Sequence, residues 1–153
     1  MTTKIIKNIS FAGQRFDNFN FYNTQFLNVD FSGCIINESK FVNCHFEGVN
    51  FINAKIYNSN FSSSYFKHAN LSDSLFNYCD LNNTSFKNAN FYNSDLSYST
   101  LKNAFLPYAN LESANLTGAD IKDTELSFSY IENAILECAN IMFANTDGVY
   151  FAI

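Results

Sequence analysis

Residues 109–121 read Ala-Asn-Leu-Glu-Ser-Ala-Asn-Leu-Thr-Gly-Ala-Asp-Ile, which is one five-residue pattern repeated. Each unit holds a small residue, Asn or Asp, a large apolar residue, a polar residue and a turn residue. From Ile6 to Phe151 every fifth residue is Phe, Leu or Ile at 29 of 30 positions, with Thr146 as the exception. We call these positions the centres. A helix repeats every 3.6 residues and a strand every 2, so a period of five requires the chain to turn once per unit.

The position two residues before each centre belongs to a second inward class. It is Ala, Ser, Thr, Cys or Val at 26 of the 29 sites from Ile9 to Val149, and the exceptions are Ile9, Gln14 and Phe19. A small side chain beside a large one fills a narrow interior without voids. The residues next to the centres are mostly polar and should point outward.

The turn position lies two residues after each centre. All five glycines occupy it, and Asn is frequent there. Gly and Asn tolerate a positive φ. The single proline, Pro107, stands just before this position, as in a type II turn. The sequence therefore predicts short extended segments joined by tight turns, which wind into a solenoid.

In this pattern the chain resembles the pentapeptide-repeat protein family. The resemblance implies an all-β fold, a right-handed quadrilateral (four-sided) β-helix with four repeats, or twenty residues, per coil, and hence about seven coils. It divides the chain into an N-terminal lead-in (1–5), the repeat solenoid (6–151) and a C-terminal end (152–153). Echoes at a period of twenty agree with it, among them the column Asn50, Asn70, Asn90 and Asn110, which should form an outward amide ladder.

The core composition changes along the chain. Phe dominates the centres from Phe11 to Phe91, whereas Leu or Ile fills every centre from Leu96 to Ile141, mostly with Ala in the small class. This predicts a wider N-terminal core and a tighter C-terminal core. Ile9 and Phe19, which are oversized for their class, should plug the first coil.

Charge excludes some functions. The net charge is −5, and residues 111–153 hold seven acidic residues against Lys122 alone. Such a surface argues against direct nucleic-acid binding through a basic patch. The N-terminus has no long apolar run and no segment approaches a membrane span, so we expect neither a signal peptide nor membrane association, and a cytoplasmic location.

Side chains that carry chemistry do not converge in the predicted fold. Cys34, Cys44 and Cys79 belong to the small inward class, while Cys138 falls at an outward corner. His45 and His68 should be exposed and too far apart to share a ligand. We therefore expect no catalytic, cofactor-binding or metal-binding residues, no cofactor, and no enzyme activity.

One outward group favours a protein interface. Stacked coils would gather exposed aromatic and apolar side chains near the C-terminal end, which is unusual on a soluble monomer. The alternative is that aromatic residues are simply tolerated on the surface of a β-ladder. The candidate interface residues are Phe105, Tyr108, Phe128, Tyr130, Met142, Phe143, Tyr150 and Phe151.

Two functions follow. The first is a non-enzymatic protein-interaction or scaffold module with an unknown protein partner, and a homodimer through the C-terminal end would cover the last coil. The acidity of that end opposes such a dimer. The alternative is the quinolone-resistance branch of the family, whose members imitate DNA and bind DNA gyrase or topoisomerase IV. Here the repeats run unbroken and the acidity is confined to the last third, which departs from that branch.

Overall fold

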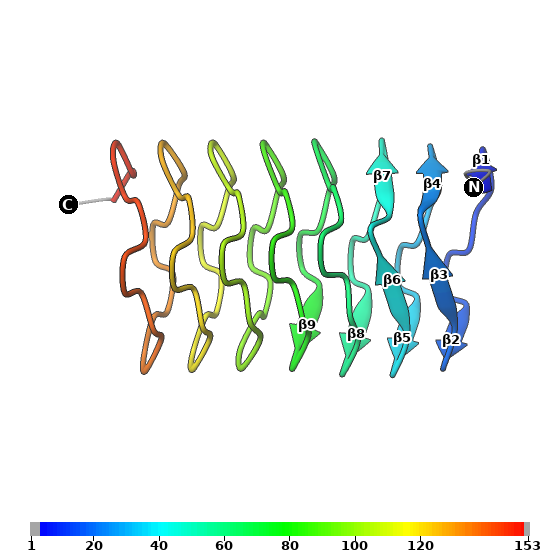
Figure 1. The fold of residues 1–153 in the computed structure, drawn as a ribbon, viewed down its shortest axis with the longest axis horizontal. Helices are drawn as coiled ribbons and strands as arrows, with labels where there is room; N and C mark the ends of the chain where they lie inside the picture. The colour runs from blue at the N-terminus through cyan, green and yellow to red at the C-terminus, as the bar shows by residue number, and fades with distance from the viewer. Residues whose placement is uncertain (1–3, 152–153) are drawn as a thin grey trace.

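The structure, a computed structural model, describes residues 4–151 and shows a straight rod with the two chain ends at opposite ends (Figure 1). Residues 1–3 of the predicted lead-in and the predicted C-terminal end, 152–153, lie outside the described residues. The described residues form strands, turns and bridges. They include no helix, and hence no helix long and apolar enough to cross a membrane.

Nine short strands form three parallel sheets along the sides of the rod. Their orders are β1-β4-β7, β2-β5-β8-β9 and β3-β6. The strands are β1 (Lys4–Lys7), β2 (Arg15–Asp17), β3 (Asn20–Tyr22), β4 (Thr24–Leu27), β5 (Ile35–Asn37), β6 (Lys40–Val42), β7 (His45–Glu47), β8 (Lys55–Tyr57) and β9 (Leu75–Asn77).

Each strand pairs with residues twenty positions later, as in Phe16 with Ile36 and Ile36 with Ile56. The fourth side, without named strands, is joined by single bridges in the same register. One such column runs in seven steps from Ser10 to Tyr150. This register confirms the predicted all-β, four-sided β-solenoid.

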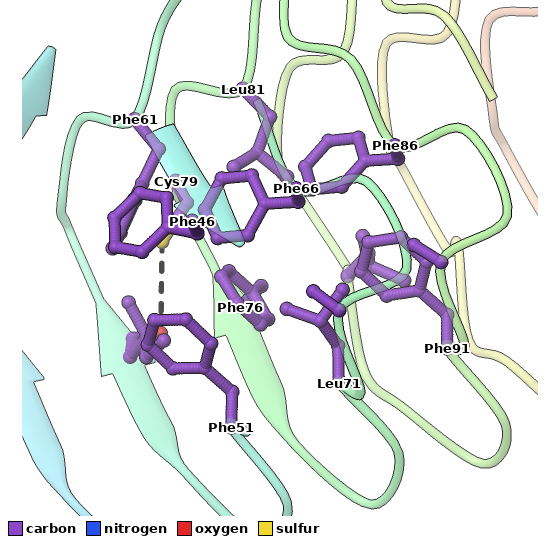
Figure 2. Close-up of a cluster of buried hydrophobic side chains, with 14 of the residues drawn as sticks. Phe46, Phe51, Phe61, Phe66, Leu71, Phe76, Cys79, Leu81, Phe86 and Phe91 are labelled. Atoms are coloured by element: carbon purple, nitrogen blue, oxygen red, sulfur yellow. Dashed lines mark hydrogen bonds between the residues drawn. The ribbon is translucent and has the colours of Figure 1, made fainter. Parts of the chain in front are cut away.

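The centres stack along the axis of the rod. The rings of Phe46 and Phe66 lie 4.3 Å apart and those of Phe66 and Phe86 lie 5.0 Å apart, and Figure 2 shows these rings pointing into the shared interior. Phe66 is fully buried, whereas its neighbour Lys67 is exposed. The predicted inward and outward assignment is confirmed.

Outward Asn and Asp residues have a role that the sequence analysis did not assign. The side-chain oxygen of Asn110 accepts the backbone N–H of Glu112 at 3.0 Å, bracing the chain across the centre between them. Its amide donates to the Asn90 oxygen at 3.2 Å, and Asn90 donates to Asn70 at 3.3 Å. The predicted amide ladder therefore exists over these coils, and each rung also holds its own backbone.

All corner residues from Asn8 to Gly148 have a positive φ, whether or not they are glycine. Glycine is therefore chosen for a further reason at some of them. A Cβ on Gly118 would lie 2.7 Å from the Tyr98 ring, and one on Gly148 would lie 2.6 Å from the Phe128 ring. These two glycines let an aromatic ring of the preceding coil lie across the corner.

The corners are of two kinds. In a closed corner the N–H three residues after the centre donates to the centre's carbonyl, as from Ala109 to Leu106 at 3.1 Å. Within residues 4–151 none of the nine strands is followed by this turn bond. We call a corner without the bond an open corner, and each strand ends at one. All ten alanines of the small class follow a closed corner: Ala54, Ala69, Ala89, Ala104, Ala109, Ala114, Ala119, Ala134, Ala139 and Ala144.

At two open corners a serine hydroxyl from the next coil replaces the missing turn bond. The Ser64 hydroxyl donates to the Phe41 carbonyl at 2.6 Å and accepts the Cys44 N–H at 2.9 Å. Ser39 bridges Phe16 and Phe19 in the same way. These buried hydroxyls satisfy backbone groups that would otherwise be orphaned.

Candidate interaction surface

An aromatic pair occupies one corner of the C-terminal part of the rod. The Tyr108 and Phe128 rings are stacked, with centroids 5.3 Å apart and planes within 9°. Their φ angles are +59° and +56°, which is an outlier for bulky side chains and costs roughly 1–2 kcal/mol each. Both rings are nonetheless about half exposed. The corner therefore combines backbone strain with solvent-exposed apolar surface.

Three further aromatic residues lie on the two sides that meet at this corner. Tyr130 and Tyr150 stack at 4.7 Å on the side that follows it, in the bridge column that includes Asn110. Phe105 lies on the side that precedes it, paired with Glu125. We call the five residues the aromatic corner: Phe105, Tyr108, Phe128, Tyr130 and Tyr150.

The structure separates the remaining candidate residues from the aromatic corner. Phe143 stands at the preceding corner of the rod, next to Met142, and is 76% exposed. The Lys122 ammonium lies 5.9 Å from the centre of the Phe143 ring, a cation–π distance. Phe151 lies at the end of the rod. The predicted set is thus divided among three places.

None of the described residues covers the core at the last coil. An apolar cavity of about 130 Å³ enters the rod there. Ile141 and Phe151 at its mouth are more than half exposed. The lining consists of nine centres, Leu111, Leu116, Ile121, Leu126, Ile131, Leu136, Ile141, Thr146 and Phe151.

Acidic side chains surround the aromatic corner. Hydrogen bonds from Ser127, and from the Asn145 amide at 2.9 Å, hold the pKa of Glu125 below its usual value despite its partial burial. Glu112 and Glu132 lie on the side that carries Tyr130. The aromatic corner is therefore set in a negatively charged surface.

The buried thiols have no reactive character. Burial raises the pKa of Cys34 and of Cys79 to about 12, and that of Cys44 to about 11. Cys138 is exposed at a corner, as predicted. Between residues 4 and 151, no His, Cys, Asp and Glu side chains cluster in a way that could hold a metal ion.

Two aromatic features escaped the sequence analysis as sites. Tyr78 and Tyr98 stack at 5.3 Å on the corner diagonally opposite the aromatic corner, and only their twenty-residue spacing signals this. The second is a shallow depression of about 350 Å³ beside the His45–Tyr65 stack. It is lined by His45, Phe46, Glu47, Tyr65, Lys67 and His68, so the two histidines share one rim although they are not neighbours in the ladder.

Comparison with known proteins agrees with this architecture. A family model described as a pentapeptide repeat region matches residues 4–74 and 59–136. No curated protein matches the chain.

Solved structures provide the fold likeness. Full-length QnrB1, described as a plasmid-mediated fluoroquinolone resistance protein, is 20% identical, with 97% of this chain and 93% of QnrB1 covered and a TM-score of 0.51. A trypsin-treated QnrB1 is 18% identical over 97% and 91% of the two chains, with a TM-score of 0.53. HetL from the cyanobacterium Nostoc is 21% identical over 95% and 81%, with a TM-score of 0.34.

Proposed function

Because the chain belongs to the pentapeptide-repeat family, we propose that it is a non-enzymatic protein-interaction module and that the aromatic corner is its main contact surface. The rod serves as a rigid support on which side chains from successive coils are held at fixed spacing.

The aromatic corner carries this proposal because its strained pair has exposed aromatic residues on both adjoining sides, Phe105 on one and the Tyr130–Tyr150 stack on the other. Asn is the commonest corner residue of the chain and accommodates a positive φ, whereas Tyr108 and Phe128 add strain and expose apolar surface. Strain of this kind persists where the surrounding structure maintains it and is concentrated at functional sites. Surface Tyr and Phe residues are also more frequent at protein–protein interfaces than on the rest of a protein surface.

Charge indicates the chemistry of the partner. Glu112, Glu125 and Glu132 lie near the aromatic corner, so a complementary surface would carry Lys or Arg together with apolar groups. An Arg side chain would bond these carboxylates and also stack on an aromatic face. We therefore propose a basic protein surface as the partner.

The test replaces the strained pair by the common corner residue, in the double variant Tyr108→Asn, Phe128→Asn. Its melting temperature should be unchanged or slightly higher, because the substitution removes the strain of two aromatic residues in the left-handed region. The double variant should bind the proteins that the wild type captures with at least tenfold lower affinity, which corresponds to about 1.4 kcal/mol of binding free energy.

The matched control is Tyr78→Asn, Tyr98→Asn at the opposite corner, which removes a similar stack of similar exposure. It should retain the captured proteins. Equal loss from both variants, or loss from neither, would contradict the assignment to the aromatic corner.

A second candidate is DNA mimicry toward DNA gyrase or topoisomerase IV. The net charge of −6 on residues 111–153 and the fold likeness to QnrB1 favour it. Its support is weaker because the acids are spread around the rod. Glu125, Glu132, Glu137 and Asp120 each lie on a different side. A supercoiling assay with purified gyrase tests it, and unchanged activity at a tenfold molar excess of the protein would contradict mimicry.

A further inference from the structure

An interrupted ladder of aromatic rings runs along the side of the rod that holds β1, β4 and β7. The bridge column on this side passes through His45, Tyr65, Ser85 and Phe105, one residue on each coil. The His45 and Tyr65 rings stack with their centroids 4.4 Å apart and their planes 26° apart. Tyr65 and Phe105 are both nearly half exposed, and only the small side chain of Ser85 stands between them. The column therefore has a gap on the coil of Ser85.

The spacing of the coils gives this gap the size of one ring. Neighbouring coils lie about 4.8 Å apart, so the two steps from Tyr65 to Phe105 span about 10 Å. A ring above Ser85 would lie about 5 Å from each neighbour, within the range of aromatic stacking. Within the described residues, all other outward aromatic pairs on consecutive coils are stacked in this way: Tyr78–Tyr98 at 5.3 Å, Tyr108–Phe128 at 5.3 Å and Tyr130–Tyr150 at 4.7 Å.

Positive charge lies beside the gap. Lys67 and Lys87 are exposed on the same side of the rod, each two residues after the ladder residue of its coil, Tyr65 or Ser85. Residues two apart on an extended segment point to the same face. Neither ammonium belongs to an ion pair in the part of the chain that the structure describes. Lys67 also lines the shallow depression beside the His45–Tyr65 stack.

The acids of these two rows lie outside the gap. Glu47 is on the coil before Lys67, and Glu125 is on the coil after Phe105. The positive charge is thus greatest at the coils of Lys67 and Lys87, where it would attract an anionic group. A space for one ring with two lysines at its side is complementary to an aromatic ring that carries a negative charge.

We propose that the interrupted ladder binds a small aromatic anion. Its planar ring lies over Ser85 between Tyr65 and Phe105, and its anionic group faces Lys67 and Lys87. This site goes beyond the interaction module proposed above. It shares Phe105 with the aromatic corner but does not depend on the partner of that corner.

The first experiment compares benzoate with its neutral and ringless counterparts, benzamide and acetate. Benzoate should shift the backbone amide NMR signals of Tyr65, Ser85 and Phe105 along one saturable binding curve. Benzamide should shift the same signals with about fivefold lower affinity, because it stacks without a charge to pair with the lysines. Acetate should produce no saturable shift there, since it has no ring to fill the gap.

The second experiment fills the gap with a ring of the protein itself. Ser85→Tyr should lower the affinity for benzoate at least tenfold. It should also raise the melting temperature by about 2–4 °C, because the new ring stacks on Tyr65 and Phe105. The matched control is Lys55→Tyr, which places a ring at the equivalent outward position of another side, between two aliphatic residues. It should bind benzoate like the wild type and gain no stacking.

The third experiment removes the charge and keeps the gap. Lys67→Ala with Lys87→Ala should weaken benzoate about fivefold, to the affinity of benzamide, and should leave benzamide unchanged. The control Lys40→Ala with Lys55→Ala removes the same charge from other sides of the rod. It should leave the affinities for both compounds unchanged.

Three results would overturn the proposal. They are the absence of a saturable shift with benzoate, equal affinity for benzoate and benzamide, and undiminished benzoate binding by Ser85→Tyr with native circular dichroism. The two proposals fail separately. Tyr108→Asn with Phe128→Asn should still bind benzoate, and the double lysine variant should still capture the proteins that bind the aromatic corner.

Discussion

The two halves of the rod follow the same five-residue period with different chain geometry. Among the described residues every strand lies at or before Asn77 (Figure 1), and the C-terminal half is joined by single bridges between corners that are closed except at Ile121. The N-terminal half has stacked Phe rings as its core, whereas the other half has Leu and Ile with Ala beside them. Period five therefore specifies the solenoid, and something else selects the path of the chain between corners.

The residue that leaves the corner contributes to this selection. Alanine always follows a closed corner, whereas the residues that follow the nine strands are larger or polar, such as Phe19, Val29 and Cys44. A methyl group lets the chain fold tightly toward the axis. A larger residue does not by itself open the turn, because Gln14, Cys34 and Val149 also follow closed corners. Alanine thus occurs with a closed turn, whereas larger residues occur at both kinds of corner.

The largest test of the comparison breaks the Phe core. Phe66→Asp should leave the protein unfolded, because a buried charge without a partner costs several kcal/mol against a typical total stability of about 5–15 kcal/mol. The outward neighbour provides the control, and Lys67→Ala should keep the wild-type melting temperature. Thermal melts followed by circular dichroism decide it. Similar melting of the two variants would mean that the inward and outward sides are misassigned.

A smaller effect tests the open corners of the N-terminal half. Ser64→Ala removes the hydroxyl that joins the Phe41 carbonyl to the Cys44 N–H, leaving two buried groups unsatisfied. The free energy of unfolding should fall by about 1–3 kcal/mol in urea denaturation. Ser62→Ala, on the half-buried outward position of the same coil, should change it by less than about 0.5 kcal/mol. Equal losses would show that the bridge is unimportant.

The smallest effect concerns a corner in the C-terminal half. Gly118→Ala places a Cβ against the Tyr98 ring and should displace it from Tyr78, whereas Gly33→Ala meets open space. Both substitutions introduce the same positive-φ strain. The difference between their unfolding free energies should therefore approximate the stacking term, about 0.5–1.5 kcal/mol. If Gly33→Ala proved as costly as Gly118→Ala, the ring contact would have no energetic role.

Much of the fold could be predicted because a period of five requires a turn in every unit, and the family resemblance then implies four units per coil. The inward placement of Phe66 and Cys79 follows directly from register, and both are buried. The open corners could not be predicted in this way. Ser64 and Ser94 read alike as small inward residues, yet one bridges two coils and the other donates to the carbonyl of its own corner. That difference depends on the neighbouring coil, which local sequence does not reveal.

The candidate surface shows the same division. Stacking of Tyr108 on Phe128 was predictable from their twenty-residue spacing. Phe143 was grouped with them because it is close in sequence, but it stands at the neighbouring corner of the rod. The backbone strain at Tyr108 and Phe128 was not predicted from the sequence. The frequent Gly and Asn at the corners indicated that a positive φ would be limited to those residue types. The parallel ladder between coils holds every corner at a positive φ, whatever residue stands there.

The twenty-residue register has a consequence for how such a chain can change length. Deleting one coil removes a slice of the rod and returns every later residue to its original side. Deleting a single five-residue unit keeps the core pattern intact but turns everything downstream by a quarter of a revolution. Tyr98 would then no longer follow Tyr78 around the same edge. The interior tolerates steps of five, whereas surface patterns survive only steps of twenty, so insertions and deletions can reshuffle the exterior of this molecule while its core stays the same.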